Sequence, residues 1–264
     1  MGKELLSIRE LKVEFVDKKI PQVVVGDFSL DIAEGEKVGI VGESGSGKTM
    51  ISLSIAGLYK NDMMRKSGKI IYKGVDIISC PQKELRGIQG REIGVIFQEP
   101  MTSLNPLKKI GWQIDEVLRL NYDYTSEERY KKVIAALDMV SLKGSEELYN
   151  AYPHQLSGGM RQRVMIAIAF VRNPNLLVAD EPTTALDIRT QTSIIDLISK
   201  LNEERNMSLV FVSHDLSLVR RLCDTVVVLK DGRVVEKGSV REIFDNPKDE
   251  YTKRLIDSIP KIEF

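Results

Sequence analysis

The segment from Gly42 to Thr49 has the composition and spacing of a phosphate-binding loop. It reads Gly-Glu-Ser-Gly-Ser-Gly-Lys-Thr, which matches the pattern G-x-x-x-x-G-K-[ST]. Glycines let the backbone curl so that its N–H groups converge on an anion, and the N-terminus of the following helix adds positive potential. The residues predicted to contact phosphate are Gly42, Ser44, Gly45, Ser46, Gly47, Lys48 and Thr49.

Two residues of this segment have distinct expected roles. Lys48 is expected to reach the outer phosphates, and the Thr49 hydroxyl is expected to bind Mg²⁺. The other interpretation is a flexible Gly/Ser turn. An apolar strand before the loop and a helical pattern from Lys48 to about Leu58 favour the phosphate loop.

A pair of acidic residues follows an apolar run farther along the chain. Leu176 to Ala179 leads directly into Asp180 and Glu181, and Pro182 comes next. A strand buried in a parallel sheet exposes its carboxyl end at the ligand crevice. Asp180 is therefore expected to hold Mg²⁺, and Glu181 to polarise a water that attacks the γ-phosphate. Alone, the tripeptide would fit an ordinary helix N-cap or turn; the phosphate loop upstream favours the catalytic interpretation.

A second anion-binding pattern begins at Ser157. Ser157, Gly158 and Gly159 stand at the start of an apolar helix, where backbone N–H groups are free to bind an anion. The chain already has one phosphate loop. A second site makes sense if it completes a nucleotide site on another copy of the chain.

These motifs, in this order and spacing, resemble the ATP-binding subunit of an ABC transporter over almost the whole chain. The resemblance implies a head-to-tail dimer that binds two ATP molecules, each between one subunit's phosphate loop and the other's Ser157, Gly158 and Gly159. Catalytic roles are then expected for Glu181, His214, Gln98 and Lys48, and metal-binding roles for Thr49, Gln98 and Asp180.

The resemblance assigns further residues one by one. Gln98 would contact the metal and the attacking water, Asp187 would cross the dimer interface, and His214 would contact the γ-phosphate. Phe15 lies where the family places an aromatic ring against adenine, with a strand-core role as the alternative. His154 is interpreted as structural or interface-forming. Met160 stands where the family most often has glutamine, but the serine and both glycines are present, so contact with ATP is expected.

Four phrases resemble the oligopeptide, dipeptide and nickel importers of this family: residues 97–106, 152–155, 181–185 and 246–252. We therefore expect an ATPase that powers peptide uptake, with nickel or metal-chelate uptake as the alternative. No cysteine follows Cys223, so the cysteine cluster of many members is absent from this sequence. The importer interpretation implies two transmembrane permease subunits, a second identical or paralogous ATPase subunit and an extracytoplasmic substrate-binding protein.

Other functional classes fit the sequence less well. A soluble DNA-repair ABC ATPase would separate the two anion-binding motifs by long coiled coils, and the intervening sequence has no heptad run. A small-molecule kinase would lack the Ser157 motif and His214. A separate ATPase chain is compatible with an exporter, but the four phrases favour an importer.

Charge and hydropathy agree with this interpretation. The 264 residues carry 38 basic and 38 acidic side chains, so the basic excess typical of nucleic-acid-binding proteins is missing. The longest apolar run, residues 164–171, is far shorter than the roughly 20 residues of a spanning helix. We expect a peripheral protein on the cytoplasmic face of the cell membrane.

The elements that must position these residues follow an α/β pattern. Apolar residues alternate with polar ones up to residue 41, which predicts an antiparallel β part, and later strands alternate with helices, which predicts a mainly parallel core sheet. We predict one P-loop ATPase domain of the ABC type. Its catalytic core spans residues 1–98 and 160–240, a helical subdomain spans 99–159, and a C-terminal tail spans 241–264.

Overall fold

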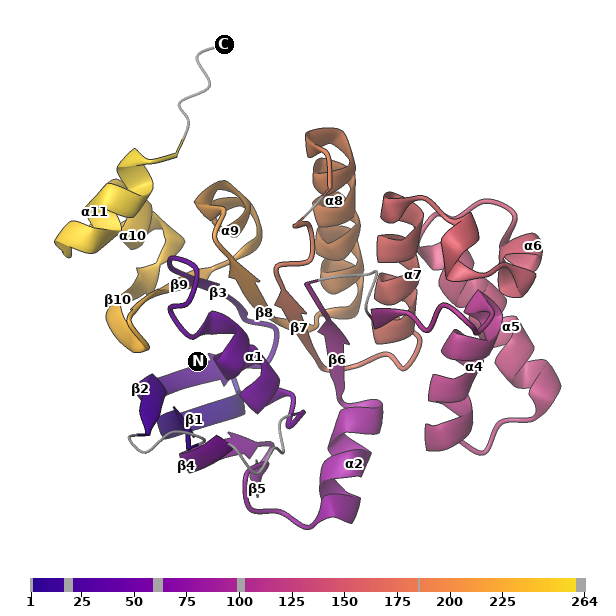
Figure 1. Cartoon of the computed structure of the whole chain (residues 1–264), viewed down its shortest axis with the longest axis horizontal. Coiled ribbons are helices and arrows are strands. Elements are labelled where there is room, and N and C mark those ends of the chain that lie inside the picture. The colour runs from indigo at the N-terminus through magenta and orange to yellow at the C-terminus, as the bar shows by residue number, and fades with distance from the viewer. Residues whose placement is uncertain (1, 17–20, 59–63, 99–102, 185, 260–264) are drawn as a thin grey trace. The chain divides into compact units, whose positions relative to one another are not determined.

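The computed structural model describes residues 2–16, 21–58, 64–98, 103–184 and 186–259 (Figure 1). The chain forms two compact units. One contains Met1–Leu85 and Asn206–Phe264, and the other contains Arg86–Arg205. Helix α2 (Gln82–Arg91), which the sequence patterns did not predict, carries the chain from the first unit into the second. The helical subdomain predicted at 99–159 falls within the second unit, and its separate status remains a prediction.

An antiparallel sheet of four strands opens the first unit, in the order β2-β1-β4-β5. Its strands are β1 (Glu4–Phe15), β2 (Gln22–Ala33), β4 (Met64–Tyr72) and β5 (Val75–Asp76). In β2, Phe28, Leu30 and Ile32 are buried and their neighbours Ser29 and Asp31 are exposed. This confirms the predicted period of two, which arises because one face of the strand packs on the core.

A second sheet of the first unit carries the phosphate loop. Its order is β10-β9-β3-β8, formed by β3 (Lys37–Val41), β8 (Ser208–Ser213), β9 (Thr225–Lys230) and β10 (Arg233–Ser239). Strand β3 pairs in parallel with β8 and β9, whereas β10 returns antiparallel to β9. The three parallel strands are almost entirely buried apolar runs, as expected for strands covered on both faces.

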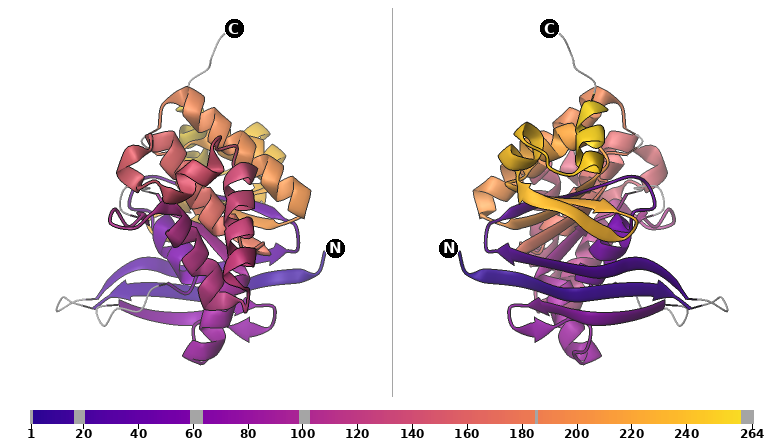
Figure 2. Two further views of the ribbon diagram at one scale, coloured as in Figure 1. Left: turned by 90° about the vertical axis from the view of Figure 1, so that its right-hand side faces the viewer. Right: turned by 90° about the vertical axis from the view of Figure 1, so that its left-hand side faces the viewer.

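Among the described residues, four helices lie wholly within the first unit. They are α1 (Lys48–Ile55), α9 (Leu216–Leu222), α10 (Val240–Asp245) and α11 (Glu250–Asp257). Figure 2 shows α10 and α11, in yellow, beside β10, and both contact that strand. The residues predicted as a C-terminal tail therefore include a packed helix, since Tyr251 and Thr252 of α11 are buried.

The second unit combines a pair of parallel strands with five α-helices among its described residues. Strand β6 (Ile93–Ile96) pairs with β7 (Leu176–Asp180). The helices are α4 (Ile110–Asn121), α5 (Ser126–Met139), α6 (Ser145–Asn150), α7 (Gly158–Phe170) and α8 (Ile188–Arg205), and a 3₁₀ turn, η1 (Pro153–Gln155), precedes α7. Helices α4, α5 and α6 contact one another, and α7 contacts α4 and α5 (Figure 1). None of the described helices combines the length and the apolar character needed to cross a bilayer.

Close packing of α9 on β3 fixes the strand that leads into the phosphate loop. A Cβ atom at Gly39 would lie 2.3 Å from Cγ1 of Val219 and 3.2 Å from Sγ of Cys223. Burial raises the pKa of the Cys223 thiol, so it stays protonated and acts as an apolar core group. The glycine is therefore needed for the helix to approach the strand.

We expect Gly39→Ala to lower the free energy of unfolding by about 1–3 kcal/mol, because the added methyl group overfills this contact. Urea denaturation measures the change. Gly87→Ala in α2 is the matched control: its Cβ would meet nothing within 4 Å, and alanine favours the helix by about 0.5–1 kcal/mol. Equal stability of Gly39→Ala and the wild type would contradict the packing argument.

Candidate functional site

The phosphate loop connects β3 to α1 and is closed by hydrogen bonds to its own carbonyl groups. Lys48, the first residue of α1, is buried, and its ammonium donates to the carbonyl oxygens of Gly42 at 2.7 Å and Glu43 at 2.8 Å. The Ser46 N–H donates to the Glu43 carbonyl at 3.2 Å. The loop is therefore a ring of backbone wrapped around a lysine ammonium.

Two glycines allow the ring to form. A Cβ atom at Gly42 would lie 2.2 Å from the Leu229 carbonyl oxygen, so no other residue fits beside β9. Gly47 caps α1 with a φ of +99°, and a Cβ there would lie 2.7 Å from the Val24 carbonyl oxygen. A positive φ costs glycine little, which explains the residue type at this bend.

The loop also holds an unused hydrogen-bonding group. Among the described residues, the buried Ser46 hydroxyl has no hydrogen-bond partner. Ser44, Gly45 and Thr49 are exposed around the same loop. A buried polar group without a partner is costly, and a phosphate oxygen is the kind of acceptor that a helix N-terminus and such a loop accommodate. The residues therefore fit a phosphate group.

His214 emerges at the same sheet edge as the loop. Strands β3 and β8 run in parallel, and Val41 is in register with Ser213. Gly42 and His214 are the next residues along the two strands, so the parallel pairing brings them to one edge, with His214 exposed. Phe15 lies at the other predicted nucleotide-binding position, at the half-buried end of β1 beside Gln22 and Met64. Its contact with a base remains a prediction.

In the second unit, Glu181 follows β7 and is held in an unusual backbone conformation. Its φ is +45°, a left-handed value that costs a residue with a side chain about 1–3 kcal/mol and that clusters at functional sites. Its carboxylate accepts from the Thr184 hydroxyl at 2.9 Å and from the Gln98 amide at 3.4 Å. Asp180, the last residue of β7, is 5% exposed. The structure thus brings Gln98 and Glu181 together at the ends of the paired strands β6 and β7.

Ser157, Gly158 and Gly159 lie at the N-terminus of α7. Ser157 is the N-cap, and its hydroxyl accepts from the Met160 N–H at 3.3 Å. Ser157 and Gly158 are exposed, and a Cβ at Gly159 would lie 2.8 Å from Cγ2 of Thr190. The motif thus stands exposed at a helix start, where the first N–H groups have no partner within the helix itself.

Asp187 caps the neighbouring helix α8. Its carboxylate accepts from the Thr190 hydroxyl at 2.6 Å and from the Thr190 N–H at 3.0 Å. These hydrogen bonds lower the pKa of Asp187, so it remains ionised. Thr190 therefore touches both Gly159 and Asp187 and links the two predicted interface elements.

The remaining sequence predictions fall into three groups. The ring of His154 stacks on the ring of Tyr152, with their centroids 5.7 Å apart, which gives His154 a local structural contact. Ala185 and residues 99–102 lie outside the described residues. The three predicted metal-binding residues are divided between the units: Thr49 belongs to the first, and Gln98 and Asp180 to the second. Where the structure is described, no three His, Cys, Asp or Glu residues gather as a separate metal centre.

Two residues that the sequence patterns did not indicate support the site: Thr184 contacts Glu181, and Tyr251 contacts the phosphate loop. The Tyr251 hydroxyl of α11 accepts from the Glu43 N–H at 3.0 Å. Thr184 stands three residues after Glu181, a spacing typical of a side chain that bonds back across a turn. No local pattern indicates Tyr251, because 208 positions separate it from Glu43.

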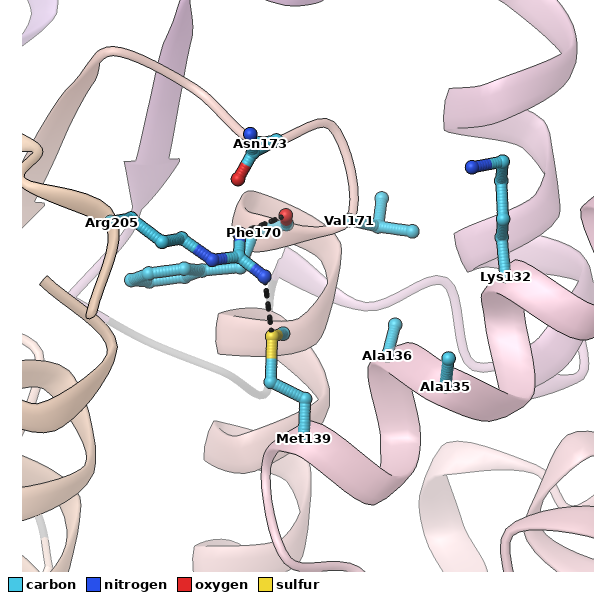
Figure 3. Close-up of a pocket in the computed structure, with 8 residues that line it drawn as sticks. All are labelled: Lys132, Ala135, Ala136, Met139, Phe170, Val171, Asn173 and Arg205. Atoms are coloured by element: carbon cyan, nitrogen blue, oxygen red, sulfur yellow. Dashed lines mark hydrogen bonds between the residues drawn. The ribbon is translucent and has the colours of Figure 1, made fainter.

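A further pocket in the second unit contains none of the predicted site residues among those that line it (Figure 3). It is lined by Lys132, Ala135, Ala136, Met139, Phe170, Val171, Asn173 and Arg205. Figure 3 shows the Arg205 guanidinium crossing it, where it donates to the Phe170 carbonyl and to Sδ of Met139, both at 2.9 Å. A cation on the last carbonyls of a helix is stabilising, so Arg205 ties the ends of α5, α7 and α8 together.

Comparison with known proteins agrees with this set of motifs. The family described as ABC transporter matches residues 25–184. The peptidoglycan transport ATP-binding protein YejF of Agrobacterium fabrum is 44% identical over 98% of this chain. The dipeptide transport ATP-binding protein DppD of Haemophilus influenzae is 42% identical over 97% of it. The chain spans 48% of the length of YejF and 78% of the length of DppD.

A solved structure shares the fold. The ATP-binding cassette MJ0796, described as a dimer in a post-hydrolysis state bound to ADP and Pi, superposes with a TM-score of 0.80 and 33% identity. The match covers 90% of this chain and 99% of the cassette. The family match covers well over half of the chain, and the relatives align along nearly all of it. This chain therefore belongs to the ABC transporter family.

Proposed function

We propose that the chain hydrolyses ATP as the nucleotide-binding subunit of an importer that takes up peptides. The observation that carries this proposal is the Glu181 carboxylate, which follows a buried parallel strand and is held by Gln98 and Thr184. A general base must be oriented toward the proton that it accepts, and two donors on one carboxylate oxygen supply that orientation.

The phosphate loop binds the nucleotide in this proposal. The backbone amides of the loop and the Ser46 hydroxyl, which has no partner within the described part of the chain, donate to the β- and γ-phosphates. The Lys48 ammonium keeps its bonds to the carbonyls of Gly42 and Glu43 and also donates to the outer phosphates, where it neutralises part of their charge. Phe15 packs against the adenine ring.

Glu181 accepts a proton from the water that attacks the γ-phosphate, and Gln98 orients that water. His214 donates to a γ-phosphate oxygen, where negative charge lies in the transition state. Thr49, Gln98 and Asp180 offer the hydroxyl, amide and carboxylate oxygens that Mg²⁺ prefers, and they are the residues that would hold this ion. The ion supplies charge neutralisation for the phosphates.

A second copy of the chain completes each site in this proposal. Ser157, Gly158 and Gly159 stand at a helix start, where Ser157 and Gly158 are exposed. Thr190 lies next to Gly159 and bonds to the ionised Asp187 carboxylate. These groups close over the nucleotide held by the partner's phosphate loop. ATP binding then favours the closed dimer, and hydrolysis and release favour the open one.

The remaining parts of the proposed importer are other chains. They are two transmembrane permease subunits, an identical or paralogous ATPase subunit and an extracytoplasmic substrate-binding protein, with the ATPases on the cytoplasmic face of the membrane. Support for a peptide cargo comes from the relatives, which are named for dipeptide, oligopeptide and peptidoglycan transport.

We expect Glu181→Gln to lower the rate of ATP turnover by about 100-fold or more, because the amide cannot accept the proton. ATP binding should persist. Phosphate release measures turnover and calorimetry measures binding. Glu204→Gln, an exposed change on α8 of the same unit, is the control and should leave turnover unchanged. Near-normal turnover in Glu181→Gln would remove Glu181 from the role of base.

The dimer can be tested in the same background. Glu181→Gln with ATP should elute as a dimer in size-exclusion chromatography, and adding Ser157→Arg should return it to a monomer, because the long side chain overfills the opposite nucleotide site. A double variant that still dimerises with ATP would contradict the proposed head-to-tail arrangement.

Disruption of the gene in its source organism should abolish growth on short peptides as the only source of a required amino acid. Growth on the free amino acid and uptake of radioactive nickel should be unchanged. The wild-type gene should restore growth on peptides, and the Glu181→Gln gene should not. Loss of nickel uptake alone would instead assign the metal cargo.

A further inference from the structure

The C-terminal segment of the first unit reaches back to the phosphate loop. Residues 246–252 follow α10 and lead into α11, and the proposed mechanism gives them no role. Tyr251, in the first turn of α11, is 5% exposed, and Thr252 is fully buried. The segment is therefore packed against the unit at a defined position.

Hydrogen bonds fix the start of α11 on β10. The Glu236 carboxylate accepts from the N–H groups of Lys248 at 2.8 Å and Asp249 at 3.1 Å. The Asp249 carboxylate caps the helix by accepting from the Tyr251 N–H at 2.7 Å. Both carboxylates accept from backbone N–H groups, so the turn before Tyr251 is held independently of the Tyr251 side chain.

The Tyr251 side chain is also held. The centroid of its ring lies 5.2 Å from Nζ of Lys230, the last residue of β9. Burial raises the pKa of the phenol, so the group remains a neutral hydroxyl with lone pairs available to a donor. That donor is the Glu43 N–H, 3.0 Å away.

One peptide group joins this contact to Lys48. The Glu43 N–H and the Gly42 carbonyl belong to the same peptide plane, and in a trans peptide they point in opposite directions. On one side the Tyr251 hydroxyl accepts from the Glu43 N–H; on the other the Gly42 carbonyl accepts from the Lys48 ammonium at 2.7 Å. The orientation of this plane therefore determines whether Lys48 finds its carbonyl partner.

The Gly42–Glu43 peptide plane rotates easily unless a hydrogen bond holds it. Gly42 precedes the bond, and glycine permits backbone angles that other residues avoid. Loss of the Tyr251 hydroxyl would leave the Glu43 N–H without this acceptor, and the plane would sample other orientations. The fraction of molecules with a binding-competent loop would fall, and the apparent affinity for nucleotide would fall with it.

We infer that Tyr251 is a positioning residue for nucleotide binding: it locks the Gly42–Glu43 peptide and couples the C-terminal helix to the conformation of the phosphate loop. This inference rests on the proposed ATPase function. It adds a contact from outside the loop that sets affinity for ATP without touching the nucleotide.

The test compares Tyr251→Phe with the wild-type full-length chain. Phenylalanine keeps the ring beside Lys230 and removes only the hydroxyl. The KM for ATP and the Kd from calorimetry should both rise about fivefold, the effect of one ordinary hydrogen bond, while kcat stays within twofold. The melting temperature without nucleotide should be unchanged within about 2 °C. Tyr130→Phe, the same chemical change in the second unit, is the control and should alter neither constant.

Three results would overturn the inference: unchanged Kd and KM, a fall in kcat with KM unchanged, or a lower melting temperature with KM unchanged, which is the signature of a merely structural role. The proposed function fails separately, if the wild type itself hydrolyses no ATP. In that event the calorimetric Kd values for the wild type and Tyr251→Phe still decide the role of Tyr251.

Discussion

The Lys48 ammonium, buried inside the phosphate loop, is the interaction on which the nucleotide site depends. A buried cation needs compensating partners, and the carbonyl oxygens of Gly42 and Glu43 supply them at 2.7 and 2.8 Å. These bonds pull the loop into a ring whose amides are left for an anion. The ring needs glycine beside β9 and at the start of α1, so the packing of β2 and β9 around the loop is part of the same constraint.

The second unit meets a different constraint, the orientation of one carboxylate. Strand β7 delivers Glu181 to the carboxyl edge of the β6–β7 pair, and a left-handed backbone turns the residue there. Gln98 from the end of β6 and Thr184 from the following turn then fix the side chain.

Much of the fold was predictable because its elements have clear periods or sharp boundaries. The buried strands β3, β7, β8 and β9 are short apolar runs, of which β3 is followed by glycine, β7 ends at an aspartate and β9 is followed by one. Strand β2 alternates with period two. Helix α2 was missed because its composition is strongly polar and carries two glycines. The C-terminal segment was predicted to be a tail because no local pattern shows that Tyr251 and Thr252 are buried.

The sequence by itself determined the chemistry: the phosphate loop, the Asp180–Glu181 pair and the Ser157 motif have residue types and spacings that few other functions require. Only the tertiary structure decided which other groups hold these motifs in place. Parallel register brings His214 to the edge occupied by Gly42, Thr190 joins Gly159 to Asp187, and Tyr251 meets Glu43 across 208 positions. The reason is physical: a motif encodes local backbone geometry, whereas contacts between distant segments arise only when the sheets and helices pack.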